Sequence, residues 1–112
     1  MRSRFITIEF PVFSYYIVHV EVTSDIKKTA AKYEQTRNIP DLENGDAWSI
    51  HPANENFSFI FLKPNPSVGT IAHECWHVVK RMMDYMGVEL DSETVAYHLG
   101  YLVDKVFRFV HR

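Results

Sequence analysis

The chain has 112 residues, of which 46% are hydrophobic and 14% aromatic, and its formal net charge is −2. This length and composition predict one domain over residues 1–112 with a packed core, and the small negative charge argues against a broad basic surface that binds nucleic acid. One cysteine permits no internal disulfide, and no stretch reaches the roughly 20 apolar residues of a membrane span, so we expect a cytoplasmic protein with no membrane partner.

The first half of the chain predicts two strands and a helix. Residues 4–10 and 15–22 are rich in β-branched and aromatic types and are separated by a proline and a serine, which indicates a pair of strands. Ser24 is a suitable N-cap for a helix that continues to about residue 37, because apolar side chains recur along one face and charged ones along the other. Residues 39–46 contain a proline and an Asn-Gly pair, which predicts a loop.

The second half predicts two more strands and two long helices. Residues 47–51 and 57–63 form a predicted hairpin, and prolines follow its second strand. Ser67 can cap a helix that runs to about residue 86, and a last helix is expected over residues 92–109. The predicted order is ββαββαα, an α+β domain in which a small, mainly antiparallel sheet packs on the helix that begins after Ser67.

That helix contains the sequence His-Glu-Cys-Trp-His at residues 73–77. His73 and His77 are four residues apart, so on a helix both imidazoles lie on one face and can reach one metal ion. Glu74 lies beside them, where it can receive a proton from a water molecule at that ion. Two neutral nitrogen ligands, an open coordination position and a carboxylate are what a zinc hydrolase requires. We therefore predict that His73 and His77 ligate Zn²⁺ and that Glu74 is catalytic.

Residues 70–79, Thr-Ile-Ala-His-Glu-Cys-Trp-His-Val-Val, resemble the metal-binding helix of the zincin metallopeptidases. The longer pattern of the metzincin branch is absent, since Lys80 stands at the position of its glycine and Met83 at that of its third histidine. The segment is therefore more similar to the gluzincin branch, in which a glutamate on the following helix is the third ligand. This resemblance implies a zinc-dependent peptidase that acts on a polypeptide.

The resemblance also implies a third zinc ligand, for which Glu93 is the first choice and Glu89 the reserve. Glu93 falls in the first turn of the last predicted helix, where an ordinary acid that stabilises the helix dipole is the alternative. Ala96 and Gly100 share the face of Glu93 and are small enough to let two helices approach closely. Asp84 is excluded because it lies about two turns, roughly 10 Å, past the second histidine.

Gluzincins stabilise the oxyanion with a tyrosine or histidine from a nearby element. Tyr97 follows the predicted third ligand by one turn and is our candidate for this catalytic role, with His98 and Tyr101 as others. A structural role is the alternative for each of the three. Cys75 is about 160° around the helix from the first histidine and is expected to point into the core.

Two functions are compatible with this sequence. The first is a zinc metallopeptidase, and the second is a non-catalytic zincin-like binding module with a structural or vestigial zinc site. For the peptidase, residues 57–63 are the candidate edge strand that pairs with an extended substrate, and a strand paired on both sides within the sheet is the alternative. The identity of the substrate and the oligomeric state are not predicted.

Overall fold

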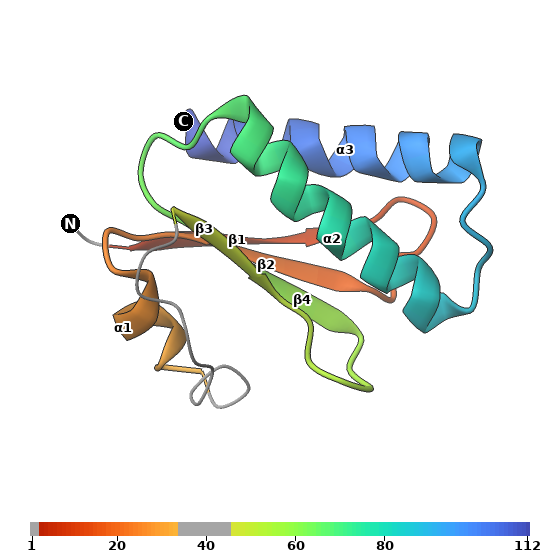
Figure 1. Cartoon of the computed structure of the whole chain (residues 1–112), viewed down its shortest axis with the longest axis horizontal. Helices are drawn as coiled ribbons and strands as arrows, with labels where there is room; N and C mark the ends of the chain where they lie inside the picture. Colours follow the sequence, from red (N-terminus) through yellow and green to blue (C-terminus); the bar gives the residue numbers. More distant parts are fainter. Residues whose placement is uncertain (1–2, 34–45) are drawn as a thin grey trace.

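A computed structural model describes residues 3–33 and 46–112 and contains one four-stranded sheet and three helices (Figure 1). The order ββαββαα is as predicted. The elements are β1 (Arg4–Glu9), β2 (Ile17–Val22), α1 (Ile26–Ala30), β3 (Ala47–Ile50), β4 (Phe57–Leu62), α2 (Val68–Met86) and α3 (Ser92–Val110).

The sheet has the strand order β1-β2-β4-β3 and is mostly antiparallel, as expected. β1 pairs with β2 and β3 pairs with β4 in antiparallel fashion, and the single parallel pair joins β2 to β4. β4 is therefore an interior strand, and the prediction that residues 57–63 form the edge strand was wrong. Residues 58–62 of β4 are all buried, a pattern that is common in interior strands covered on both faces. The edge strands are β1 and β3.

The two long helices cover one face of the sheet and α1 lies against the other face (Figure 1). Alternation along β4 divides its side chains between two apolar clusters. Ile60 and Leu62 belong to the larger cluster beneath α2 and α3, whereas Phe59 and Phe61 pack with Ile26 of α1. A strand with period-two alternation thus supplies both cores, and the larger one fixes the position of α2 on the sheet.

The long helices begin and end where the sequence indicates. The Ser67 hydroxyl accepts a hydrogen bond from the Thr70 amide at 3.0 Å and caps α2. Gly87 ends α2 with φ +70°, the left-handed conformation that suits glycine. Asp91 caps α3 by accepting bonds from the amides of Glu93 and Thr94. Among the described residues, no helix combines the length and the apolarity needed to cross a membrane.

The first helix differs from its prediction. Asp25, and not Ser24, is the N-cap of α1, and its carboxylate accepts a hydrogen bond from the Lys28 amide at 3.0 Å. Aspartate and serine are both good N-cap residues. Which of Ser24 and Asp25 is the N-cap therefore depends on which of them directly precedes the first helical residue, Ile26. α1 ends at Ala30, and residues 34–37 of the predicted helix lie outside the described residues, as does most of the predicted loop.

Candidate metal centre

His73 and His77 lie one turn apart on α2 with their rings facing each other. Their Nε2 atoms are 3.2 Å apart, the ring centroids are 4.7 Å apart and the ring planes meet at 83°. Two nitrogens that each lie 2.0–2.1 Å from a tetrahedral zinc ion are separated by roughly 3.3–3.4 Å. The two nitrogens therefore have the spacing that shared coordination of a single ion needs.

The burial pattern of α2 explains why these two rings face solvent. The helix packs on the sheet through one apolar stripe, formed by Ile71, Cys75, Val78, Val79, Met82 and Met83. His73 and His77 lie outside that stripe and are exposed. Burying the stripe against the sheet holds the helix in place and leaves the two histidines accessible to solvent.

Glu74 is 8% exposed and reaches a pocket on the same side of α2 as His73. This pocket is about 470 Å³ in volume and lies where the start of α2 meets the start of β3. Its lining is formed by Asp46, Ala47, Ser67, Gly69, Thr70, His73 and Glu74. We call it the Glu74 pocket. A carboxylate that is largely buried next to an accessible histidine is placed to exchange a proton with a ligand in that pocket.

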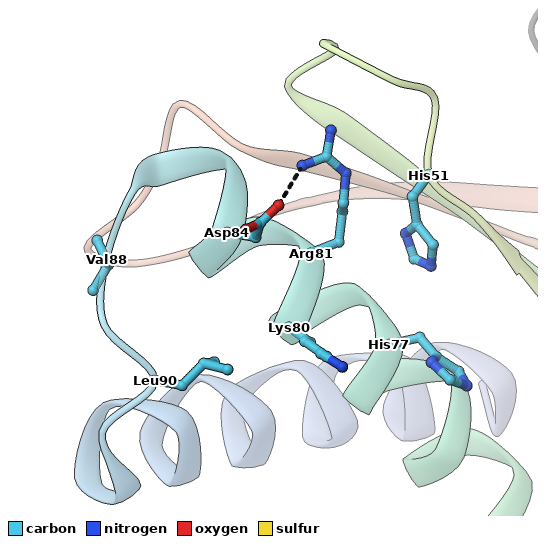
Figure 2. Close-up of a pocket in the computed structure, with 7 residues that line it drawn as sticks. All are labelled: His51, His77, Lys80, Arg81, Asp84, Val88 and Leu90. Atoms are coloured by element: carbon cyan, nitrogen blue, oxygen red, sulfur yellow. Dashed lines mark ion pairs between the residues drawn. The ribbon is translucent and has the colours of Figure 1, made fainter.

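A second pocket of about 650 Å³ lies beside His77 (Figure 2). We call it the Lys80 pocket. Its lining is formed by His51, His77, Lys80, Arg81, Asp84, Val88 and Leu90. His73 lines the Glu74 pocket and His77 lines the Lys80 pocket. Ala47, the first residue of β3, also lines the Glu74 pocket, and His51, which directly follows β3, lines the Lys80 pocket. The two pockets thus follow β3 and α2 with the candidate metal centre between them.

From the sequence, His51 could line a pocket, with a place in the core as the alternative, and the structure places it in the lining of the Lys80 pocket. Its Nδ1 is 2.8 Å from the Ser58 hydroxyl, its Nε2 is 3.2 Å from the Ser49 hydroxyl, and Ser58 in turn lies 2.6 Å from the Tyr16 hydroxyl. Burial, with smaller contributions from the nearby His77 and Arg81, lowers the pKa of His51 to about 4. Ser49 is two residues before His51 in the chain, whereas Ser58 comes from β4, which pairs with β3.

Glu93 and Tyr97 lie away from the histidine pair. Together with Ala96 and Gly100 they form one face of α3, as predicted, but all four are exposed, so the expectation that this face packs closely against α2 was wrong. α3 begins after the connection that follows the C-terminal end of α2 (Figure 1), and His77 lies about 14 Å before that end of α2 at 1.5 Å per residue. Within residues 3–33 and 46–112, no group of three His, Cys, Asp or Glu side chains could hold a metal ion.

The other candidates of α3 have structural contacts. His98 is buried, its Nδ1 lies 2.8 Å from the Thr94 carbonyl, and its ring stacks on Phe13 at 4.9 Å. The Tyr101 hydroxyl donates a hydrogen bond to the Glu9 carbonyl at 3.0 Å. Neither side chain lines a pocket beside the histidine pair, so the structural alternative describes both.

Cys75 lies in the core, as expected, and is fully buried. Burial, with a smaller contribution from the negative charge of Glu74, raises the pKa of its thiol to about 12. A thiol with this pKa is protonated near neutrality and is therefore a poor metal ligand or nucleophile.

Comparisons with known proteins found no match among protein-family models, curated proteins or solved structures. Functional interpretation therefore depends on the residues themselves and on the geometry of the histidine pair with its two pockets.

Proposed function

We propose that this chain is a zinc-dependent metallopeptidase in which His73 and His77 hold the ion and Glu74 is the general base. The observation that carries the proposal is the 3.2 Å separation of the two Nε2 atoms, with the Glu74 carboxylate lining the adjoining pocket. The two imidazoles match the bite of one ion, and the next residue along the chain supplies a carboxylate on the same side. Ligand spacing and a proton acceptor thus occur together at one place on α2.

The chemistry follows from these side chains. A bound zinc ion supplies a Lewis acid that polarises a carbonyl and brings the pKa of a coordinated water toward about 7. Glu74 takes the proton from the attacking water and afterwards gives it to the leaving amine. Its position at 8% exposure limits competition from bulk water while keeping contact with the Glu74 pocket. We propose no oxyanion donor from Tyr97, because that side chain is 55% exposed and outside both pocket linings.

The third zinc ligand has a test of its own. Catalytic zinc sites usually have three protein ligands, and Glu93 becomes one only if the first turn of α3 approaches the histidine pair on binding. A Glu93→Gln variant that loses zinc affinity by tenfold or more would keep Glu93 in the site. Unchanged affinity would exclude it, and solvent or substrate would then complete the coordination.

The substrate strand that fits this site runs along β3, the edge strand nearest to the histidine pair. β3 pairs with β4 on one side, and in the described part of the chain no strand pairs with its other side. An extended peptide can add to such an edge through backbone hydrogen bonds. The zincins that the sequence resembles also have an edge strand along the cleft, which supports β3 in this role and replaces the strand chosen from the sequence.

Zinc content and peptide cleavage, measured on the same preparations, test the proposal. Glu74→Gln should retain zinc and lose 10²- to 10⁴-fold in cleavage rate of a proteome-derived peptide mixture, because only the proton acceptor is removed. His77→Ala should lose zinc itself. His111→Ala, a change at an exposed histidine near the end of α3, is the matched control and should leave zinc content and cleavage unchanged. Cleavage by Glu74→Gln at the wild-type rate would refute the role of Glu74.

A non-catalytic zinc-binding module is the second candidate, and one observation favours it. The described residues bring two ligating side chains together and no third. If the wild-type protein binds zinc stoichiometrically and cleaves no peptide of the mixture, while zinc raises its melting temperature, the binding module replaces the peptidase.

A further inference from the structure

We propose that the Lys80 pocket binds a carboxylate of the substrate, so that the enzyme selects peptides with an acidic group on the His77 side of the scissile bond. This inference rests on the proposed function, because it assigns a substrate class to the same site. The pocket shares His77 with the candidate metal centre, so a group held in it lies next to the reacting bond (Figure 2).

The charges of the pocket favour an anion. Lys80 and Arg81 contribute two positive charges and Asp84 one negative charge, which leaves the lining with an excess of one positive charge. Arg81 is paired with Asp84 at 3.6 Å, whereas no ion pair of Lys80 is found in the described part of the chain. Lys80 is therefore the cation available to a ligand.

Arg81 is a second cation of the Lys80 pocket that can donate hydrogen bonds to an anionic ligand. Its side chain is 21% exposed, and it is held between Asp84 and the ring of Tyr85, whose centroid lies 5.7 Å from the guanidinium carbon. One guanidinium nitrogen faces Asp84, and an arginine has five N–H donors, so donors are left over for a second acceptor. Lys80 and Arg81 line the same pocket at different places, so an acidic ligand can reach a cation at either one (Figure 2).

The apolar part of the lining indicates which other groups the ligand carries besides the carboxylate. Val88 and Leu90, from the connection between α2 and α3, line the pocket on the side away from His51, and Leu90 is 49% exposed (Figure 2). A volume of about 650 Å³ exceeds what one carboxylate fills. The pocket therefore suits an acidic residue together with a neighbouring apolar side chain.

The opposite pocket has the opposite character. Asp46 and Glu74 give the Glu74 pocket two carboxylates, so an acidic group is repelled there. Of these two pockets, only the Lys80 pocket is therefore favourable for an acidic group. This difference in charge orients the peptide with respect to the histidine pair as well as selecting it.

Binding measured without turnover tests the inference separately from the peptidase proposal. The protein used is zinc-loaded Glu74→Gln, and the probes are acetyl-Ala-Leu-Xaa-Ala-Leu-amide with Xaa either Glu or Gln, and acetyl-Ala-Leu-Ala-Leu with a free or an amidated C-terminus. We expect one acidic probe to bind about three- to fivefold more tightly than its neutral partner at low salt, the upper part of the range for one exposed charge pair. The Glu/Gln pair detects a side-chain carboxylate, and the free/amidated pair detects a C-terminal carboxylate.

Variants of the pocket assign the preference to its residues. Lys80→Ala should reduce the preference to less than twofold, and Lys80→Glu should reverse it in favour of the neutral probe. Lys28→Ala, which removes a lysine of α1 on the opposite face of the sheet, is the matched control and should leave the preference intact. Equal affinity for all four probes, or no binding of any, overturns the inference. If the acid preference depends on Lys80 but the wild-type protein cleaves no peptide, the assignment of the Lys80 pocket holds and the peptidase proposal is refuted.

Discussion

Replacing His51 by asparagine should flatten the dependence of stability on pH in the metal-free protein. The pKa of His51 falls from the ordinary 6.5 to about 4 in the folded state, chiefly because the ring is buried. Between these two pH values the unfolded chain binds a proton at this position and the folded chain does not. The contribution of neutral His51 to stability is therefore present above pH 6.5 and is lost as the pH falls toward 4.

The size of the effect follows from the same two values. A change from 6.5 to about 4 corresponds, at 1.36 kcal/mol for each pKa unit, to about 3 kcal/mol at most. This is a large part of the 5–15 kcal/mol that typically stabilises a domain. The side-chain amide introduced by His51→Asn can keep a hydrogen bond to Ser58 but does not titrate, so the variant removes the proton linkage with little change in the surrounding contacts.

Urea unfolding in the presence of a chelator, followed by tryptophan fluorescence at several pH values between 7.5 and 4, measures the effect. Carboxylates also titrate in this range, so the informative quantity is the difference between wild type and variant at each pH. We expect wild type to lose about 2–3 kcal/mol more than His51→Asn between pH 7 and 4. His111→Asn is the control and should follow wild type. Parallel curves for wild type and His51→Asn would refute the reasoning that burial keeps this ring neutral.

Two further predictions concern α2. Gly87→Ala should lower the free energy of unfolding by about 1 kcal/mol in a urea titration, because Gly87 has φ +70° and an added Cβ meets nothing within 4 Å, so the cost is conformational and not steric; an unchanged midpoint would contradict this assignment of the helix end. The Cys75 thiol should react with a disulfide reagent at least 100-fold more slowly in the folded protein than in urea, because it is buried and its pKa is raised to about 12; fast labelling of the folded protein would mean that the core opens at this position.

Local signals were sufficient for most of the element order. Ser67 and Asp91 accept backbone amides as capping residues, and Gly87 takes the left-handed conformation that ends a helix, so each of these boundaries depends on a residue and its nearest neighbours. The hairpin of β3 and β4 is also local in sequence. These elements agree with their predictions because their causes lie within a few residues.

The position of β4 in the sheet could not be obtained in the same way. Its parallel partner is β2, in a register that places Ile17 opposite Phe57, forty positions later in the chain. The apolar residues on both faces of β4 allowed an interior strand, but they did not exclude an edge strand covered by side chains. The choice is made by the long-range pairing of β4 with β2.

The sequence placed His73 and His77 on one face of α2 but did not determine where Glu93 lies relative to them, for a related reason. Helical spacing placed Glu93 and Gly100 on one face of α3, but it does not decide which face packs on the rest of the molecule. Burial of the larger apolar side chains decides it, since Leu102 and Val106 are fully buried and belong to the main core. Burying these residues removes more apolar area from water than burying small ones does, so the face of Glu93 is exposed.

β3 has four residues and pairs with one strand of the sheet, so fewer backbone hydrogen bonds hold β3 than hold its neighbour β4, which is paired on both sides. A guest strand along its free side would double its partners. The amide hydrogens of β3 should then exchange fastest in the free protein. They should also slow down most when a peptide binds, because the bound peptide and not the core then orders this strand.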